Sequence, residues 1–186
     1  MELIETVELK ILSEEATPET FDAWKTYLNE AKWGWLVIEP AITSLAVDSK
    51  VLEVGAGSQA LTAQVASRGM TVTAIEPSSV GFSIMKTLGE KVHALSYEAG
   101  IQYEIIDTTG EQFDEVEKFD FAFSINVMEH VHDVNAVLDN VVASLKIGGS
   151  YQFICPNYLF PFEPHFNVPT LINKRLTNLF IRKVAI

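Results

Sequence analysis

The chain lacks several features that would point directly to a function. Its 186 residues include one cysteine, Cys155, so no internal disulfide and no metal site built from cysteines is possible. No apolar run reaches the roughly 18 residues that a membrane span needs. The acidic N-terminus has no apolar segment of the kind found in cleavable signal peptides. We therefore expect a cytoplasmic protein.

Basic residues are also scarce, since 13 Lys and Arg stand against 25 Asp and Glu, for a formal net charge of -12. Binding to nucleic acid needs a basic surface, so this balance argues against a nucleic-acid partner. The histidines and acids show no metal-ligand spacing, and we expect no metal site. With 48% apolar residues, the chain has the composition and length of one globular domain with a sizeable core.

Short apolar segments alternate with helical patterns from Lys50 onward. We expect strands over residues 50–54, 71–76, 102–106, 119–125 and 150–155, and helices over residues 60–67, 80–88 and 134–145. Such an alternation predicts an α/β fold, a doubly wound and mainly parallel sheet covered on both faces. Residues 146–149 predict the end of a helix followed by a turn.

The N-terminal part follows a different pattern. Residues 1–18 are mixed and acidic, and they predict a loose arm. Residues 21–45 predict a helical segment in two pieces, broken near Gly34 and Pro40. This segment contains all three tryptophans of the chain: Trp24, Trp33 and Trp35. We expect them to pack on the main core, with the lining of a substrate pocket as the alternative.

The most informative segment joins the strand over 50–54 to the helix that follows it. Gly55 and Gly57 form a Gly-x-Gly turn, and Ala60 completes the Gly-x-Gly-x-x-Ala fingerprint of dinucleotide sites. Glycine lets the backbone approach a ligand closely, and the helix N-terminus presents free N–H groups. The turn therefore predicts a nucleotide site, and a NAD(P)-binding domain is one interpretation of it.

Four polar residues stand at or directly after the C-terminal ends of the expected strands: Glu53, Glu76, Asp107 and Asn126. Doubly wound sheets bind their ligands beyond the C-terminal ends of the strands. Glu76 comes 19 positions after Gly57, which matches the acid that binds ribose hydroxyls about 20 residues on in dinucleotide folds. Each acid could instead cap a helix or turn, but three together favour a ligand site.

Charge distinguishes between the nucleotides that this edge could hold. A dinucleotide brings a pyrophosphate to the glycine turn, where the carboxylate of Glu53 would repel it. No Lys or Arg lies between Lys50 and Arg68 to offset that repulsion. An acidic edge suits S-adenosylmethionine instead, which carries a sulfonium, an ammonium and a ribose diol but no phosphate.

Three segments, residues 51–57, 119–131 and 137–150, resemble class I S-adenosylmethionine-dependent methyltransferases of the small-molecule type, similar to methyltransferase types 11 and 23. The resemblance implies a Rossmann-like fold, with S-adenosylmethionine as cofactor. It also implies a division of the chain: an N-terminal arm and helical cap over residues 1–49, an S-adenosylmethionine-binding core over residues 50–157, and a substrate-side loop with a C-terminal helix over residues 158–186.

The resemblance implies that the methyl donor is held by residues at matching positions: Glu53, Gly55, Ala56, Gly57, Glu76, Asp107, Thr108 and Asn126. Glu53 would help to fix the ammonium, and Glu76 would bind the ribose hydroxyls. Asp107 would face the adenine amino group, with Thr108 beside it. Gln59 stands where many members have a third glycine, and we expect it to modify the turn without abolishing binding.

Methyl transfer from a sulfonium is an in-line displacement with a good leaving group, so a hydroxyl acceptor is the case that needs a general base. The candidates are Glu129, His130, His132 and His165. His165, beyond the last expected strand, is the favoured base or acceptor contact, and a structural turn histidine is the alternative. His130 is a second catalytic candidate, but a role in holding its loop is favoured. His132 is expected to be a solvated residue before a helix.

The class I fold normally ends with two further strands, which residues 158–186 do not predict. We expect a truncated fragment, with a shortened variant as the alternative, and we expect the basic C-terminal helix to pack on its own domain rather than on a membrane. The predicted function is methyl transfer to a small molecule: a metabolite, a quinone precursor, or a sugar or lipid intermediate. A NAD(P)-dependent oxidoreductase and a non-catalytic binding module remain alternatives.

Overall fold

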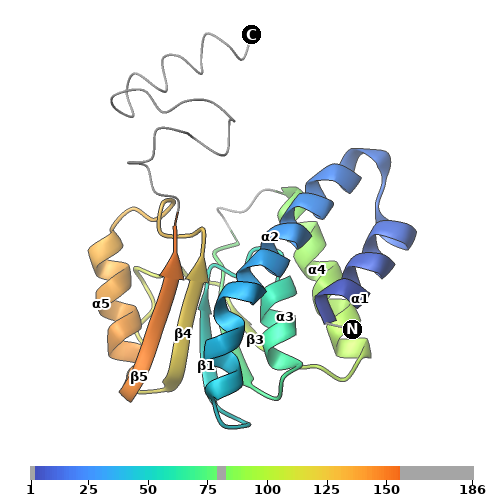
Figure 1. Ribbon diagram of the computed structural model, residues 1–186. Coiled ribbons are helices and arrows are strands. Elements are labelled where there is room, and N and C mark those ends of the chain that lie inside the picture. Colours follow the sequence, from blue (N-terminus) through green and yellow to red (C-terminus); the bar gives the residue numbers. More distant parts are fainter. Residues whose placement is uncertain (1–2, 79–82, 156–186) are drawn as a thin grey trace, which may run out of the picture.

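The computed structural model describes residues 3–78 and 83–155, which form a five-stranded parallel sheet with helices on both faces (Figure 1). The strands are β1 (Lys50–Val54), β2 (Thr71–Ile75), β3 (Glu104–Ile106), β4 (Phe119–Ile125) and β5 (Leu145–Ile154). Their order in the sheet is β3-β2-β1-β4-β5, and each neighbouring pair is parallel. This confirms the predicted doubly wound α/β fold and puts its switch point between β1 and β4.

Two strands match their predicted ranges, β1 and β4, and both are almost wholly buried. The predicted turn over residues 146–149 is wrong, because these residues belong to β5. Leu145 pairs with Phe119, but Ser150 pairs with Phe121, so the extra residues form an irregularity in the strand rather than a free turn. Gly148, with φ +86°, provides the backbone conformation that this bulge requires.

Three helices connect the strands: α3 (Ala60–Ala66), α4 (Ser83–Glu98) and α5 (Val134–Ser144). The first and last agree closely with the prediction, whereas α4 continues well past residue 88. Leu88 and Val92 of α4 are both fully buried in the core, so the apolar stripe that holds this helix on the sheet extends beyond the predicted end.

The N-terminal segment is ordered, so the predicted loose arm is wrong. It forms α1 (Leu3–Lys10) and a π-helical turn, η1 (Ile11–Glu15). Ile4, Val7 and Ile11 are buried in the core. The backbone N–H of Ile4 also donates to Oε1 of Gln64 on α3, at 3.1 Å. Burial of apolar side chains at helical spacing holds this segment against the domain.

A single helix, α2 (Pro18–Ser44), replaces the two helical pieces that were predicted. Gly34 does not break the helix; it lets the helix pack closely, since a Cβ there would lie 3.0 Å from Cδ2 of Leu61 on α3. Pro40 lies between Ile38 and Ile42, whose complete burial holds the helix across it.

The tryptophans of α2 have two different environments. Trp24 and Trp35 are buried in the main core, which confirms the packing prediction for them, whereas Trp33 is 46% exposed. The indole N–H of Trp24 donates to the backbone oxygen of Ile84, at 3.2 Å. This bond joins α2 to the first turn of α4.

The alternation of side chains along β1 divides the core into two layers. Val51 contributes to the layer under α1, α2, α3 and α4, while Leu52 and Val54 face the layer under α5. Glu53 therefore shares the face of Val51. Within the described ranges, no helix is long and apolar enough to cross a membrane.

We expect Ile11→Ala to lower the free energy of unfolding by about 2–5 kcal/mol, the usual cost of truncating a fully buried isoleucine. Leu9→Ala, two residues away and 63% exposed, is the matched control and should change it little. Urea unfolding gives the free energy of unfolding of both variants. Equal stability of the two would mean that the N-terminal segment does not pack as described.

Candidate functional site

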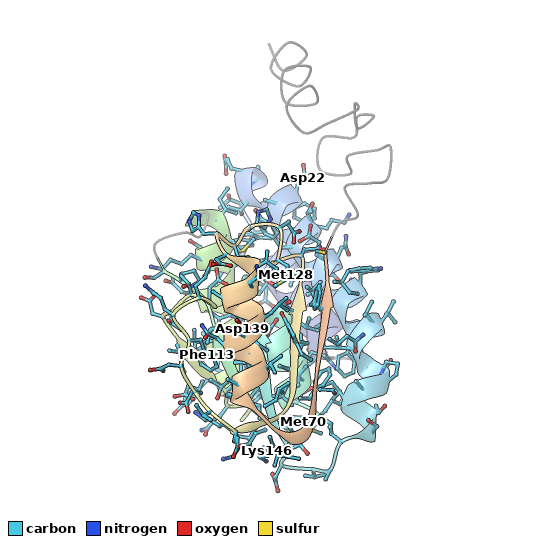
Figure 2. All side chains as sticks on the ribbon, turned by 90° about the vertical axis from the view of Figure 1, so that its left-hand side faces the viewer. Asp22, Met70, Phe113, Met128, Asp139 and Lys146 are labelled. Carbon is cyan, nitrogen blue, oxygen red and sulfur yellow. The ribbon has the colours of Figure 1, made fainter. Side chains whose placement is uncertain are left out.

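The site lies at the C-terminal edge of the sheet. Met128, in the loop after β4, marks this edge in Figure 2, while Met70 and Lys146 lie at the opposite edge. The carboxyl ends of β1, β2, β3 and β4 meet here, at the switch point where doubly wound sheets bind ligands. The structure therefore brings the predicted strand-end residues to one edge.

The glycine turn after β1 has the left-handed backbone that its sequence predicts, with φ +79° at Gly55 and φ +47° at Gly57. A Cβ at Gly55 would lie only 2.4 Å from Cγ2 of Val127, in the loop after β4. Because no side chain fits in that space, glycine at this position is what allows the ends of β1 and β4 to meet. Ala56, between the two glycines, is buried.

Gln59 also adopts a left-handed conformation, with φ +59°, immediately before α3. Its Oε1 accepts a hydrogen bond from the Tyr103 hydroxyl at 3.3 Å. Its Nε2 lies against Gly89 of α4, where a Cβ would be 2.9 Å away. The turn therefore forms without a third glycine, and the side chain of Gln59 fills the space between the turn and α4.

Glu53 is a buried carboxyl at the end of β1, with 4% of its surface exposed. The Thr62 hydroxyl on α3 donates a hydrogen bond to it. Burial raises the pKa of the Glu53 carboxyl to about 8; the bond from Thr62 acts against the rise, and the negative charge of Glu76 adds to it. Sequence reasoning missed Thr62, although its place in the first turn of the following helix is a usable signal.

Glu76 joins the end of β2 to the glycine turn, because its Oε2 accepts the backbone N–H of Gly57 at 3.0 Å. Burial raises the pKa of the Glu76 carboxyl, and this hydrogen bond lowers it in part. Glu53 and Glu76 are thus two interacting carboxyls on adjacent strands, both next to the glycine turn.

Asp107 follows β3 and is exposed, unlike the other two acids. Its two carboxylate oxygens accept from the backbone N–H and the hydroxyl of Ser78, at 2.8 and 2.6 Å, and these bonds lower the pKa of the carboxyl. Thr108 donates its backbone N–H to Ile106. Asn126, with φ +55°, donates its N–H to Ile154 of β5.

Two of the candidate histidine bases, His130 and His132, are exposed at the surface. The side chain of His130 is 69% exposed, and its Nε2 lies 3.9 Å from Oε1 of Glu129. His132 is exposed before α5 and donates its backbone N–H to Glu111, as expected for a solvated residue. His165, with the rest of the predicted substrate-side loop and C-terminal helix, lies outside the described residues.

These features fit S-adenosylmethionine better than a dinucleotide. Two partly or wholly buried carboxyls adjoin the turn, and burial raises the pKa of both; an ammonium would supply the counter-charge that lets them ionise, whereas a phosphate would not. The turn has no lysine or arginine to bind a phosphate.

Comparison with known proteins agrees with this fit. Residues 52–153 match the family described as "Methyltransferase domain". An uncharacterized protein of Mycobacterium tuberculosis is 41% identical over 160 residues, which cover 86% of this chain and 54% of the relative. A ubiquinone biosynthesis O-methyltransferase of Paramagnetospirillum magneticum is 34% identical over 102 residues, 55% of this chain and 38% of that protein.

Solved structures share the fold. A crystal structure of a putative S-adenosyl-L-methionine-dependent methyltransferase from Methanococcus maripaludis superposes with a TM-score of 0.56 at 14% identity, over 97% of this chain and 70% of that one. A putative methyltransferase from Anabaena variabilis gives a TM-score of 0.54 at 18% identity, over 68% and 47% of the two chains.

The fold and site define a Rossmann-like, class I S-adenosylmethionine-dependent methyltransferase domain. The chain belongs to the methyltransferase domain family, whose methyl donor is S-adenosylmethionine. This decides between the two kinds of nucleotide that the glycine turn left open. The chain spans about half the length of the curated relatives that it matches over most of its own residues.

We expect Gly55→Ala to destabilise the protein more than Gly100→Ala does. Both glycines have φ near +80°, so both variants carry a backbone strain of about 1–2 kcal/mol. At Gly100 nothing lies within 4 Å of the new Cβ, whereas at Gly55 the loop at Val127 must also move. Equal losses in urea unfolding would show that the contact between turn and loop contributes nothing.

The raised pKa of Glu53 gives stability a defined pH dependence. Between the ordinary value of 4.5 and about 8 the folded protein holds a proton that the unfolded chain has lost, so stability falls as pH rises through this window. Glu53→Gln, which is neutral at every pH, should match the wild type in melting temperature near pH 5 and exceed it near pH 8.5. Glu90→Gln, on the surface of α4, is the control. Melting temperatures of wild type and Glu53→Gln that run parallel with pH would contradict the assignment.

Proposed function

We propose that the protein transfers the methyl group of S-adenosylmethionine to a hydroxyl group of a small molecule. The observation that carries the proposal is the pair of buried, interacting carboxyls, Glu53 and Glu76, beside a glycine turn without basic residues. Family membership supports the reaction class. A location in the cytoplasm is part of the same proposal.

The donor-binding roles follow from what each side chain offers. Glu53 attracts the ammonium of the methionine part, because an ionised carboxyl at this buried position gains a counter-charge that the free protein lacks. Glu76 has one oxygen on Gly57 and a second that can accept from the ribose hydroxyls. Asp107, fixed by Ser78, lies at the exposed end of the edge and accepts from the adenine amino group, with Thr108 beside it. Asn126, at the end of β4, completes the site.

When bound, S-adenosylmethionine supplies an electrophilic methyl group on a positively charged sulfur. The protein then has to orient the acceptor oxygen in line, exclude water and remove the hydroxyl proton. We assign His130 and His165 as the candidates for that last role. The oxygen assignment is supported by the relatives named ubiquinone biosynthesis O-methyltransferases, and a quinone precursor is accordingly one acceptor to examine.

The excess of acidic residues makes a nucleic-acid acceptor unfavourable. A metabolite or a sugar or lipid intermediate with a free hydroxyl also fits. A non-catalytic module would have no reason to retain Glu53 in a buried position that disfavours its charge, which is why an active donor site is preferred.

Thermal shift with S-adenosylmethionine, S-adenosylhomocysteine and NADH tests the proposal. A ligand that binds only the folded state, at 100 times its dissociation constant, adds about 2.7 kcal/mol to stability. We expect both sulfur nucleotides to raise the melting temperature and NADH to leave it unchanged. Stabilisation by NADH alone, or by none of the three, would overturn the proposal.

Glu76→Gln tests whether the Glu76 carboxylate binds the ribose hydroxyls of the methyl donor. Gln keeps an oxygen for the N–H of Gly57 but loses the charge, so the turn is retained while a charge-assisted hydrogen bond to the donor is lost. We expect the dissociation constant of S-adenosylmethionine to rise at least tenfold by calorimetry. Asp139→Asn, an exposed carboxylate of α5, should bind as the wild type does.

A further inference from the structure

The side chain of Glu129 lies in the loop after β4 and is only 1% exposed, yet neither of its carboxylate oxygens has a hydrogen-bond partner. Within the described ranges, these are the only buried side-chain polar atoms in that condition. Leaving a buried polar group without a hydrogen-bond partner destabilises the folded state, because the group has lost its bonds to water. A buried polar group without a partner in a folded protein therefore calls for an explanation, and a role in catalysis is one such explanation.

Its loop does not need Glu129 for support. Asn126 donates its N–H to Ile154 at 2.9 Å, and His130 donates its N–H to Val127 at 2.8 Å. Further along, Glu111 accepts the N–H groups of His132 and Asp133. These bonds fix both ends of the loop, so the carboxylate of Glu129 is held in place by the backbone around it.

The loop lies against the proposed donor site. Val127 occupies the space next to Gly55 of the glycine turn, and Glu129 and His130 follow it within three residues. Among the edge carboxylates of the described residues, Glu53, Glu76 and Asp107 each accept at least one hydrogen bond, whereas neither oxygen of Glu129 accepts one.

The ring of His130 lies close to this carboxylate, with Nε2 at 3.9 Å from Oε1 of Glu129. This ring is 69% exposed, so a small rotation can bring Nε2–H within hydrogen-bond distance of the carboxylate. Once Nε2 carries the proton and faces Glu129, Nδ1 has a free lone pair on the opposite side of the ring. A buried carboxylate behind an exposed imidazole is the arrangement that orients a histidine base.

We propose that Glu129 and His130 form a general-base pair for a hydroxyl acceptor, an inference that rests on the proposed function. His130 is the catalytic residue and Glu129 its positioning residue. The acceptor oxygen forms a bond to the methyl carbon as the carbon–sulfur bond breaks. The electron pair of the broken carbon–sulfur bond stays on the sulfur. Nδ1 of His130 takes the hydroxyl proton, Glu129 stabilises the resulting imidazolium, and the exposed ring then releases the proton to water.

The first test needs no acceptor. Glu129→Gln and Glu129→Met should fold at least as stably as the wild type in urea unfolding, because the carboxyl that each removes has no hydrogen-bond partner to lose. Asp139→Asn on α5 is the control. A loss of more than tenfold in the folding equilibrium constant for both Glu129 variants would show that the carboxylate holds the loop, and would overturn the proposal.

Nitrogen NMR of ¹⁵N-histidine-labelled protein, with S-adenosylhomocysteine present, tests the pairing itself. We expect the ring nitrogen signals of His130 to move in Glu129→Gln and to stay in place in Asp139→Asn. Unchanged signals in Glu129→Gln would overturn the pair. The wild-type thermal shift with S-adenosylmethionine reports separately on the proposed function.

Transfer to catechol and to phenethylamine, followed by formation of S-adenosylhomocysteine, tests the acceptor class. With catechol we expect kcat to fall about 100-fold in His130→Gln and at least tenfold in Glu129→Gln, at unchanged KM for S-adenosylmethionine. The double variant should be no slower than His130→Gln, since both residues act in one step. Methylation of phenethylamine alone would overturn the hydroxyl assignment.

Discussion

The contact between Gly55 and Val127 is the constraint on which the rest of the site depends. It joins the turn after β1 to the loop after β4, at the point where the strand order changes direction. Acids from β1 and β2 lie on one side of this contact, and the loop with Glu129 and His130 lies on the other. A space that admits no Cβ thus places the residues proposed for the methyl donor beside those proposed for the acceptor.

Local pattern was sufficient for β1 and β4, which are short buried apolar runs, but not for the start of β5. It also placed Glu53, Glu76 and Asp107 at strand ends that meet at one edge, since the alternation with helices implies parallel strands. The N-terminal predictions failed for tertiary reasons. Gly34 is used for close packing against Leu61 rather than as a break, and the burial of Ile11 depends on a core that composition does not reveal. The unpaired state of Glu129 could not be predicted, since the lack of a partner is a property of the folded chain alone.

The three acids at the C-terminal edge of the sheet differ widely in exposure and in the direction of their pKa shifts. Glu53 is buried and holds its proton, Glu76 is partly buried with one oxygen on the backbone, and Asp107 is exposed and ionised. The exposure of these acids thus increases from strand to strand, from β1 at the switch point through β2 to β3. We propose that this gradient in exposure matches a ligand whose positive end lies deep in the site and whose base lies near water.

The close packing of α4 on the glycine turn has a mechanical consequence. Gly89 brings this helix against Gln59, and the indole of Trp24 binds the backbone of its first turn at Ile84, so α2, α4 and the turn are tied in series. A shift of the long N-terminal helix would therefore be transmitted to the backbone at the donor site, and conversely a ligand seated on the turn would stiffen α2.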